Sequence, residues 1–160
     1  MKKILIDVQK CVGCRSCEIA CRVAHSETKS IYSAIFEERL AQKRIFVENI
    51  KENPVPLNCR HCEDAPCVNA CMTGALFKTP NGLTLCYEEL CVGCFMCVMV
   101  CPFGVINENR YESRIIKCDR CSERDIPACV EACPTKALQF VEVKEYASTK
   151  RKEYLTEIVA

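Results

Sequence analysis

The stretch from Cys11 to Cys21 reads "CVGCRSCEIAC", with four cysteines at the spacing C-x2-C-x2-C-x3-C. Four thiols in so short a segment have three common explanations: they form disulfides, bind zinc, or hold an iron–sulfur cluster. The rest of the chain must decide among them. The answer also decides the fold. In a chain this small, the cysteine ligands and the metal centres that they bind would form much of the core.

Composition narrows the choice. Cysteine accounts for 17 of the 160 residues, a content typical of small secreted disulfide scaffolds. Export requires a signal with an apolar region of roughly 7–15 residues, but "MKKILIDVQKC" has only Ile4, Leu5 and Ile6 before Asp7. No apolar run approaches the ~20 residues that cross a bilayer. We therefore expect a cytoplasmic protein, in which thiols stay reduced and cysteines in such numbers are metal ligands.

The cysteines form an internal repeat. Each of four groups begins C-x2-C and ends C-x3-C, and only the middle gap varies. The groups are Cys11, Cys14, Cys17 and Cys21; Cys59, Cys62, Cys67 and Cys71; Cys91, Cys94, Cys97 and Cys101; and Cys118, Cys121, Cys129 and Cys133. Cys86 stands alone.

The repeat favours cubane clusters over zinc. A C-x2-C loop brings two thiolates to one centre, and the last cysteine of each group lies one helical turn beyond the third. In the bacterial ferredoxin pattern this last cysteine reaches the other cluster of a pair and is followed by proline. Pro102 and Pro134 follow groups three and four, whereas Arg22 and Met72 follow the first two. Zinc usually takes two knuckles separated by a longer loop, which these quartets do not match. Sixteen grouped cysteines predict four [4Fe-4S] clusters.

The charge changes sign when clusters are included. The chain alone has a formal net charge of +1, from 22 basic and 21 acidic side chains spread along its length. This distribution makes nucleic acid a poor candidate partner. An oxidised all-cysteinate cubane carries about two negative charges, so four of them bring the loaded chain to about −7. We therefore expect docking surfaces on partners to be basic.

The runs around the cysteines predict an α+β fold of short helices and hairpins. Pro80-Asn81-Gly82 marks a hairpin turn between groups two and three, which together resemble one complete ferredoxin unit. Linker length alone equally allows groups three and four as partners. In the longest cysteine-free segment, Ile31, Ile35, Phe36 and Leu40 predict a short amphipathic helix before a strand.

If groups two and three pair, we expect a single polyferredoxin domain over residues 1–160, in which two interleaved bacterial-ferredoxin-like βαβ units surround four cubane clusters. The predicted parts are an inner unit at 53–106, an outer unit at 1–25 plus 107–143, an insertion at 26–52 and a C-terminal helical tail at 144–160.

The motifs resemble the four-cluster ferredoxin-type electron-transfer subunits of bacterial and archaeal oxidoreductases. The resemblance extends from Cys11 to about Phe140. Within this family, "CRVAHSETKSIY", "VPLNCRHCEDAPCVNAC" and "CVGCFMCVMVCPFGVI" are most similar to the iron–sulfur partner of anaerobic carbon monoxide dehydrogenase. The resemblance implies an electron carrier without its own catalytic site. Electrons would pass from carbon monoxide dehydrogenase to a hydrogenase or pyridine-nucleotide oxidoreductase. The alternative is a subunit of a formate dehydrogenase, a hydrogenase or a molybdenum/tungsten aldehyde oxidoreductase.

The family also implies a nested set of ligands. Carried over to this chain, the four sets are Cys11, Cys14, Cys17 and Cys133 (cluster 1); Cys118, Cys121, Cys129 and Cys21 (cluster 2); Cys59, Cys62, Cys67 and Cys101 (cluster 3); and Cys91, Cys94, Cys97 and Cys71 (cluster 4).

Three further residues have ordinary explanations. His25 and His61 are interpreted as structural polar residues, and the alternative is that they tune a nearby cluster by hydrogen bonding to sulfur. Cys86 falls in a predicted strand, where a buried cysteine acts as a small apolar residue. The sequence contains no recognisable nucleophile, phosphate loop or flavin motif, so we expect no catalysis within the chain.

Overall fold

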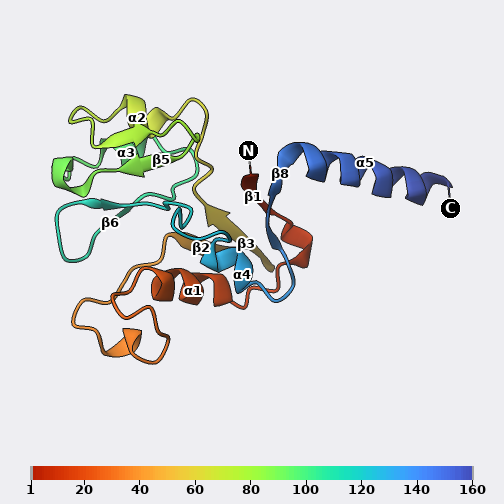
Figure 1. The fold of residues 1–160 in the computed structure, drawn as a ribbon, viewed down its shortest axis with the longest axis horizontal. Coiled ribbons are helices and arrows are strands. Elements are labelled where there is room, and N and C mark those ends of the chain that lie inside the picture. Colours follow the sequence, from red (N-terminus) through yellow and green to blue (C-terminus); the bar gives the residue numbers. More distant parts are fainter. Residues whose placement is uncertain (1, 160) are drawn as a thin grey trace.

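The computed structural model describes residues 2–159 and contains only short regular elements apart from one helix (Figure 1). This agrees with the α+β fold of short helices and hairpins that the sequence predicts. The strands are β1 (Lys2–Ile6), β2 (Ile45–Ile50), β3 (Asn53–Asn58), β4 (Leu76–Lys78), β5 (Thr84–Cys86), β6 (Asn107–Glu108), β7 (Ile115–Ile116) and β8 (Leu138–Glu142). The helices are α1 (Ser16–Ala24), α2 (Pro66–Asn69), α3 (Met96–Met99), α4 (Ala128–Glu131) and α5 (Val143–Val159), with 3-10 turns η1 (Val8–Lys10), η2 (Ala34–Phe36) and η3 (Glu88–Leu90).

The strands form four two-stranded antiparallel sheets. Three join neighbours in the sequence: β2 with β3, β4 with β5, and β6 with β7. The fourth joins the two ends of the chain, because β1 pairs with β8 and Ile4 lies opposite Phe140. This long-range pair brings the segments before group one and after group four side by side.

The helices follow the same division into two halves. Helix α1 packs against α4, and α2 packs against α3. In Figure 1 the elements α2, α3 and β5 lie together on one side, whereas α1, α4, β1 and β8 lie on the other. Groups one and four therefore share one half of the molecule, and groups two and three share the other.

Each half has its own small core, and cysteines are part of both. The first core contains Ile4, Ile45, Val47 and Leu138 together with Cys17, Cys21, Cys129 and Cys133. The second contains Leu76, Ile106 and Ile115 with Cys97, and several half-buried cysteines pack against it. Because thiols replace much of the usual aliphatic packing, whatever the thiols bind contributes directly to the fold.

The prediction of a short amphipathic helix between residues 26 and 44 is wrong. Only η2 forms there, and Ile35 and Phe36 remain exposed. Polar contacts hold this segment instead. The backbone N–H and the hydroxyl of Thr28 both donate to Glu37, and the backbone N–H of Leu40 donates to the hydroxyl of Tyr111. The following strand was predicted correctly as β2, which pairs with β3 across the expected boundary between residues 52 and 53.

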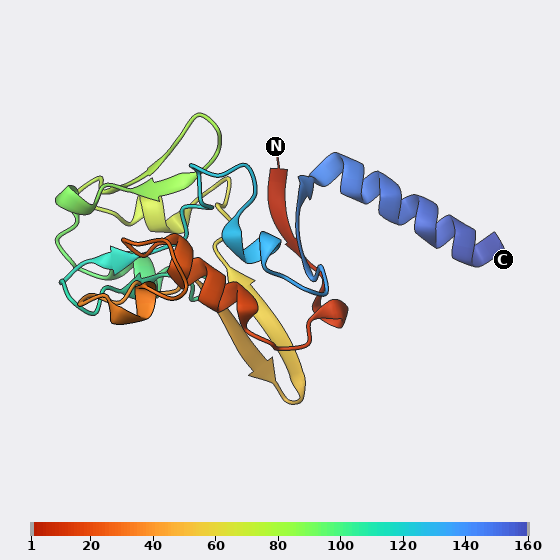
Figure 2. The ribbon, with the colours of Figure 1, turned by 60° about the horizontal axis from the view of Figure 1, so that its bottom comes forward.

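The C-terminal segment is helical. Helix α5 is the longest element, and it runs away from the rest of the chain in Figures 1 and 2. None of its described side chains is buried. Within residues 2–159, no helix has both the length and the apolar character needed to span a membrane.

Candidate metal centres

The four C-x2-C loops share one backbone feature. The residue just before the second cysteine is left-handed in every loop, with φ values of +69° at Gly13, +47° at His61, +66° at Gly93 and +61° at Arg120. Glycine adopts this conformation without strain, whereas histidine and arginine adopt it at a cost. The left-handed turn curls successive N–H groups toward the inside of the loop, where they favour negative charge. At His61 and Arg120 these N–H groups lie 3.5 and 3.3 Å from the sulfur atoms of Cys59 and Cys118.

Two of the four predicted ligand sets line small cavities. Cys11, Cys14 and Cys17 of group one surround one cavity together with Cys133 of group four. Cys91, Cys94 and Cys97 of group three surround another together with Cys71 of group two. In each case the fourth thiol comes from a different group, and from the group in the same half of the molecule.

The members of the other two sets are identified as neighbours by the effect of their thiols on one another's pKa values. Burial raises the pKa of the Cys129 thiol, and the nearby thiols of Cys118, Cys21 and Cys121 raise it further. The four residues of that predicted set are therefore neighbours, with Cys21 as the member from another group.

In the remaining set, burial raises the pKa of Cys67 although Lys117 opposes the shift. The thiols of Cys59 and Cys101 reinforce the increase. Cys101 thus lies beside the group two cysteines and supplies the thiol from another group.

This donor set fits a cationic centre bound through sulfur. Burial raises the pKa of Cys17 and of Cys97 to about 11, and of Cys118 to about 12. Neighbouring cysteine thiols add to each of these shifts. Clustered thiols with such pKa values resist ionisation unless a cation is bound beside them. Iron supplies the positive charge that allows all of them to bind as thiolates, so a [4Fe-4S] cluster fits each set.

His25 Nδ1 lies 3.8 Å from the sulfur of Cys21, and further hydrogen bonds to sulfur come from residues that the sequence analysis did not single out. The backbone N–H of Arg44 donates to the sulfur of Cys21, and that of Leu76 donates to the sulfur of Cys71. The hydroxyls of Thr73 and Thr135 lie 3.6 and 3.9 Å from the sulfurs of Cys71 and Cys133. A signal for the two threonines was present, because "CMTGAL" and "CPTKAL" repeat the same pattern after groups two and four.

His25 is fully engaged within the protein. Its Nδ1 lies 2.7 Å from the carbonyl oxygen of Cys21, and its Nε2 lies 3.1 Å from both carboxylate oxygens of Asp119. Burial alone lowers the pKa of His25, but hydrogen bonds to Asp119 and Cys21 raise it to about 9. Asp119 also accepts from Arg44. His25, Asp119 and Cys121 place ligand atoms within 4.8 Å of one another, but this hydrogen-bonded arrangement explains their proximity without a separate metal ion.

Cys86 lies in β5, as predicted, and packs half-buried against the second core. Burial raises the pKa of its thiol to about 12, and the neighbouring Cys91 and Cys71 contribute to the shift. It does not line either of the two cysteine cavities. A small, protonated side chain in a core is consistent with the packing role that the sequence predicts.

Comparison with known proteins agrees with this chemistry. Residues 50–143 match the family described as the 4Fe-4S dicluster domain. A protein of Rhodospirillum rubrum named iron–sulfur protein is 39% identical over 164 residues, covering 92% of this chain and 86% of the relative. The B subunit of anaerobic dimethyl sulfoxide reductase of Escherichia coli K12 is 33% identical over 149 residues, covering 88% of this chain and 73% of the relative.

Among solved structures, the active-site complex BamBC of benzoyl coenzyme A reductase contains a polypeptide with the same fold. Its TM-score is 0.51 at 22% identity, with 98% of this chain and 90% of that polypeptide covered. The chain therefore belongs to the 4Fe-4S dicluster family of ferredoxin-type proteins. It is an iron–sulfur electron-transport protein of the kind that serves larger oxidoreductases, as the sequence predicts.

Proposed function

We propose that this chain holds four [4Fe-4S] clusters in two interleaved ferredoxin-like units and relays electrons from a catalytic subunit to a second redox protein. The observation that carries the proposal is that the last cysteine of one group lies beside the first three cysteines of another. Cys133, for example, lines the same cavity as Cys11, Cys14 and Cys17. The proposed ligands are the four predicted sets: Cys11, Cys14, Cys17 and Cys133; Cys118, Cys121, Cys129 and Cys21; Cys59, Cys62, Cys67 and Cys101; and Cys91, Cys94, Cys97 and Cys71.

The arrangement of the sets supports a linear relay. Cys129 of the second set has Cys17 of the first among its electrostatic neighbours, and Cys118 has Cys59 of the third. Cys97 of the fourth set in turn has Cys67 of the third. These neighbours support the proposal that the clusters follow one another in the order one, two, three, four.

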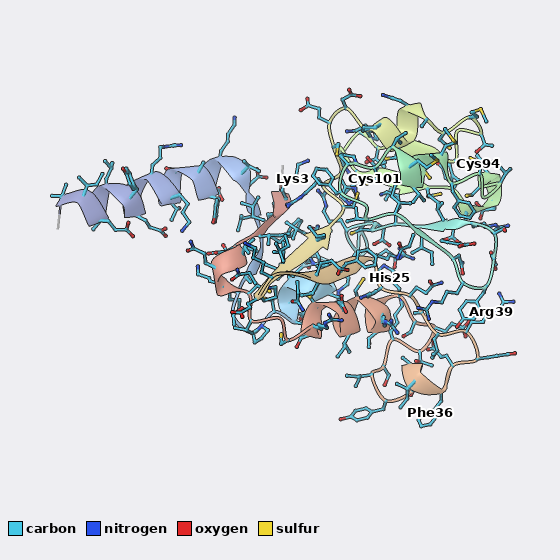
Figure 3. All side chains as sticks on the ribbon, turned by 180° about the vertical axis from the view of Figure 1, so that it is seen from behind. Lys3, His25, Phe36, Arg39, Cys94 and Cys101 are labelled. Atoms are coloured by element: carbon cyan, nitrogen blue, oxygen red, sulfur yellow. The ribbon has the colours of Figure 1, made fainter. Side chains whose placement is uncertain are left out.

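The two ends of this row are the most open. Cys14 in the first set and Cys94 in the fourth are exposed. In Figure 3, Cys94 lies at the far edge of its half of the molecule, whereas Cys101 lies nearer the middle. Partners that exchange electrons with the chain are therefore proposed to dock near these two residues.

The protein's own residues make the relay possible by burial and compensating charge. When bound, each cluster supplies reversible one-electron chemistry. Lys117, which is only 5% exposed, donates to the carbonyl oxygens of Thr84 and Cys118 between the two middle sets. A buried ammonium at this position offsets part of the negative charge that loading adds, which brings the net charge to about −7.

We further propose that the electron donor is a nickel–iron carbon monoxide dehydrogenase and that the acceptor is a hydrogenase or pyridine-nucleotide oxidoreductase. This assignment rests on the similarity of segments such as the one from Cys21 to Tyr32. The cytoplasm, where thiols stay reduced, is the proposed compartment. The second candidate is an electron-transfer subunit of a formate dehydrogenase, a hydrogenase or a molybdenum/tungsten (aldehyde) oxidoreductase. The similarity to the B subunit of dimethyl sulfoxide reductase is the observation that favours this second candidate.

The donor is tested by mixing the oxidised, loaded protein with carbon monoxide dehydrogenase from the same source under carbon monoxide. Bleaching of the iron–sulfur absorption follows reduction, and protein without the dehydrogenase serves as the control. We expect rapid bleaching that slows as salt is added, because docking to a chain of about −7 depends on charge. No bleaching with this enzyme, together with fast bleaching by a formate or aldehyde oxidoreductase, would transfer the assignment to the second candidate.

A further inference from the structure

His61 differs from His25 in the number of hydrogen bonds that it makes. It lies between Cys59 and Cys62 with a left-handed φ of +47°, and it is only 3% exposed. Its carbonyl oxygen accepts a hydrogen bond from the ammonium of Lys3 at 3.3 Å. His61 also lines a cavity together with Lys3, Cys59 and Arg120, so it lies where the two halves of the molecule meet, beside the loop that follows Cys118.

The protonation state of His61 follows from its contacts. The backbone N–H of Thr84 donates to Nδ1 at 3.0 Å, so Nδ1 is the acceptor and carries no hydrogen. An imidazole that accepts a hydrogen bond at Nδ1 cannot be the doubly protonated cation, because both ring nitrogens of the cation are donors. The ring is therefore neutral, and its single N–H is at Nε2.

This N–H has no protein partner. Nε2 is buried, and no acceptor contacts it among the residues that the structure describes. The cationic neighbours Lys117, Arg120 and Lys3 are themselves donors and cannot accept from it. A buried donor left unpaired is costly, so a native structure normally provides an acceptor. The proposed clusters of the Cys59 and Cys118 sets would supply sulfur atoms as acceptors, which the described protein residues do not provide.

We propose that Nε2–H of His61 donates a hydrogen bond to a sulfur atom of one of the two middle clusters, the one bound through Cys59 or the one bound through Cys118. This inference rests on the proposed set of clusters. Such a bond stabilises the reduced cluster, which carries one more negative charge, and so raises its reduction potential above that of an otherwise equal cluster. His61 thus tunes one middle step of the relay.

Two substitutions separate the two hydrogen bonds of this ring. His61→Asn keeps an acceptor near the Nδ1 position for the N–H of Thr84 and tolerates a positive φ, but it removes the distant donor. His61→Gln places an amide N–H near the Nε2 position and is the matched variant that restores the donor. Both are measured by potentiometric titration followed by electron paramagnetic resonance, with iron content per chain determined on the same samples.

We expect His61→Asn to lower the potential of one cluster while the other three remain unchanged, and His61→Gln to return that potential toward the wild-type value. Wild-type protein with isotope-labelled imidazole nitrogens should show a nitrogen coupling to one reduced cluster, and this measurement does not depend on variants that load poorly. Unchanged potentials in loaded His61→Asn, or no such coupling, would overturn the role of His61 and leave the four clusters standing. A wild-type iron content near half of that expected for four clusters would overturn both.

Discussion

Replacing Gly93 by alanine tests how tightly the cluster-binding loops are fitted to the rest of the fold. Gly93 has a φ of +66°, and a Cβ at this position would lie 2.1 Å from the carbonyl oxygen of Ser113 and 2.8 Å from its carbonyl carbon. The left-handed conformation alone costs alanine about 1–2 kcal/mol. Relieving the overlap requires a backbone shift of the kind that costs a further ~1–3 kcal/mol or more in a packed region.

The matched control is Gly104→Ala. Gly104 has a similar φ of +59°, but a Cβ there meets no atom within 4 Å, so only the conformational cost applies. We therefore expect Gly93→Ala to be less stable than Gly104→Ala by about 1–3 kcal/mol, which corresponds to roughly 2–12 °C in the midpoint of thermal loss of visible absorption. We also expect it to lose iron from the set of Cys91, Cys94 and Cys97. Equal midpoints and iron contents for the two variants would refute the close approach of this loop to Ser113.

Three other predictions concern individual side chains. Cys101→Ser should alter the same spectroscopic signal as Cys59→Ser, because both residues are proposed ligands of one cluster; an altered signal from the Cys118 set instead would reassign the pairing. Cys86→Ala should leave the iron content unchanged, since Cys86 belongs to no set, and the loss of one cluster would show that it is a ligand. Glu18, which is 7% exposed, accepts from Lys43 and from the backbone N–H of Val47 at 2.7 Å each. Glu18→Ala should therefore lower the unfolding free energy by about 2–3 kcal/mol, and more than Glu18→Gln does; equal losses would mean that these bonds contribute little.

The cysteine repeat predicted most of the chemistry because ligand spacing is a local property. Four quartets with a constant beginning and end indicate cubane sites whatever the rest of the chain does. The hairpin around Pro80-Asn81-Gly82 was also local, and β4 and β5 form on either side of it. The threonines that lie near Cys71 and Cys133 were visible as a repeat, but their meaning depends on a sulfur contact that only the folded chain reveals.

The partner of group three could not be decided from linker lengths, because two pairings were equally feasible. The antiparallel pair of β1 and β8, whose register includes Ile6 opposite Leu138, joins segments more than 130 residues apart. No local pattern encodes such a contact. The failed helix prediction near Ile35 has a related cause, since apolar spacing was taken as a buried face where the structure leaves it exposed. The different hydrogen bonds of His25 and His61 could not be predicted either, because they depend on where the folded chain places Asp119 and Thr84.

The central claim, that four cysteine sets hold four cubane clusters, is tested most directly by iron and acid-labile sulfide per chain after anaerobic purification or reconstitution. Sixteen grouped cysteines predict about sixteen iron atoms and an equal number of sulfides. Values near eight, or stoichiometric zinc without sulfide, would contradict the account.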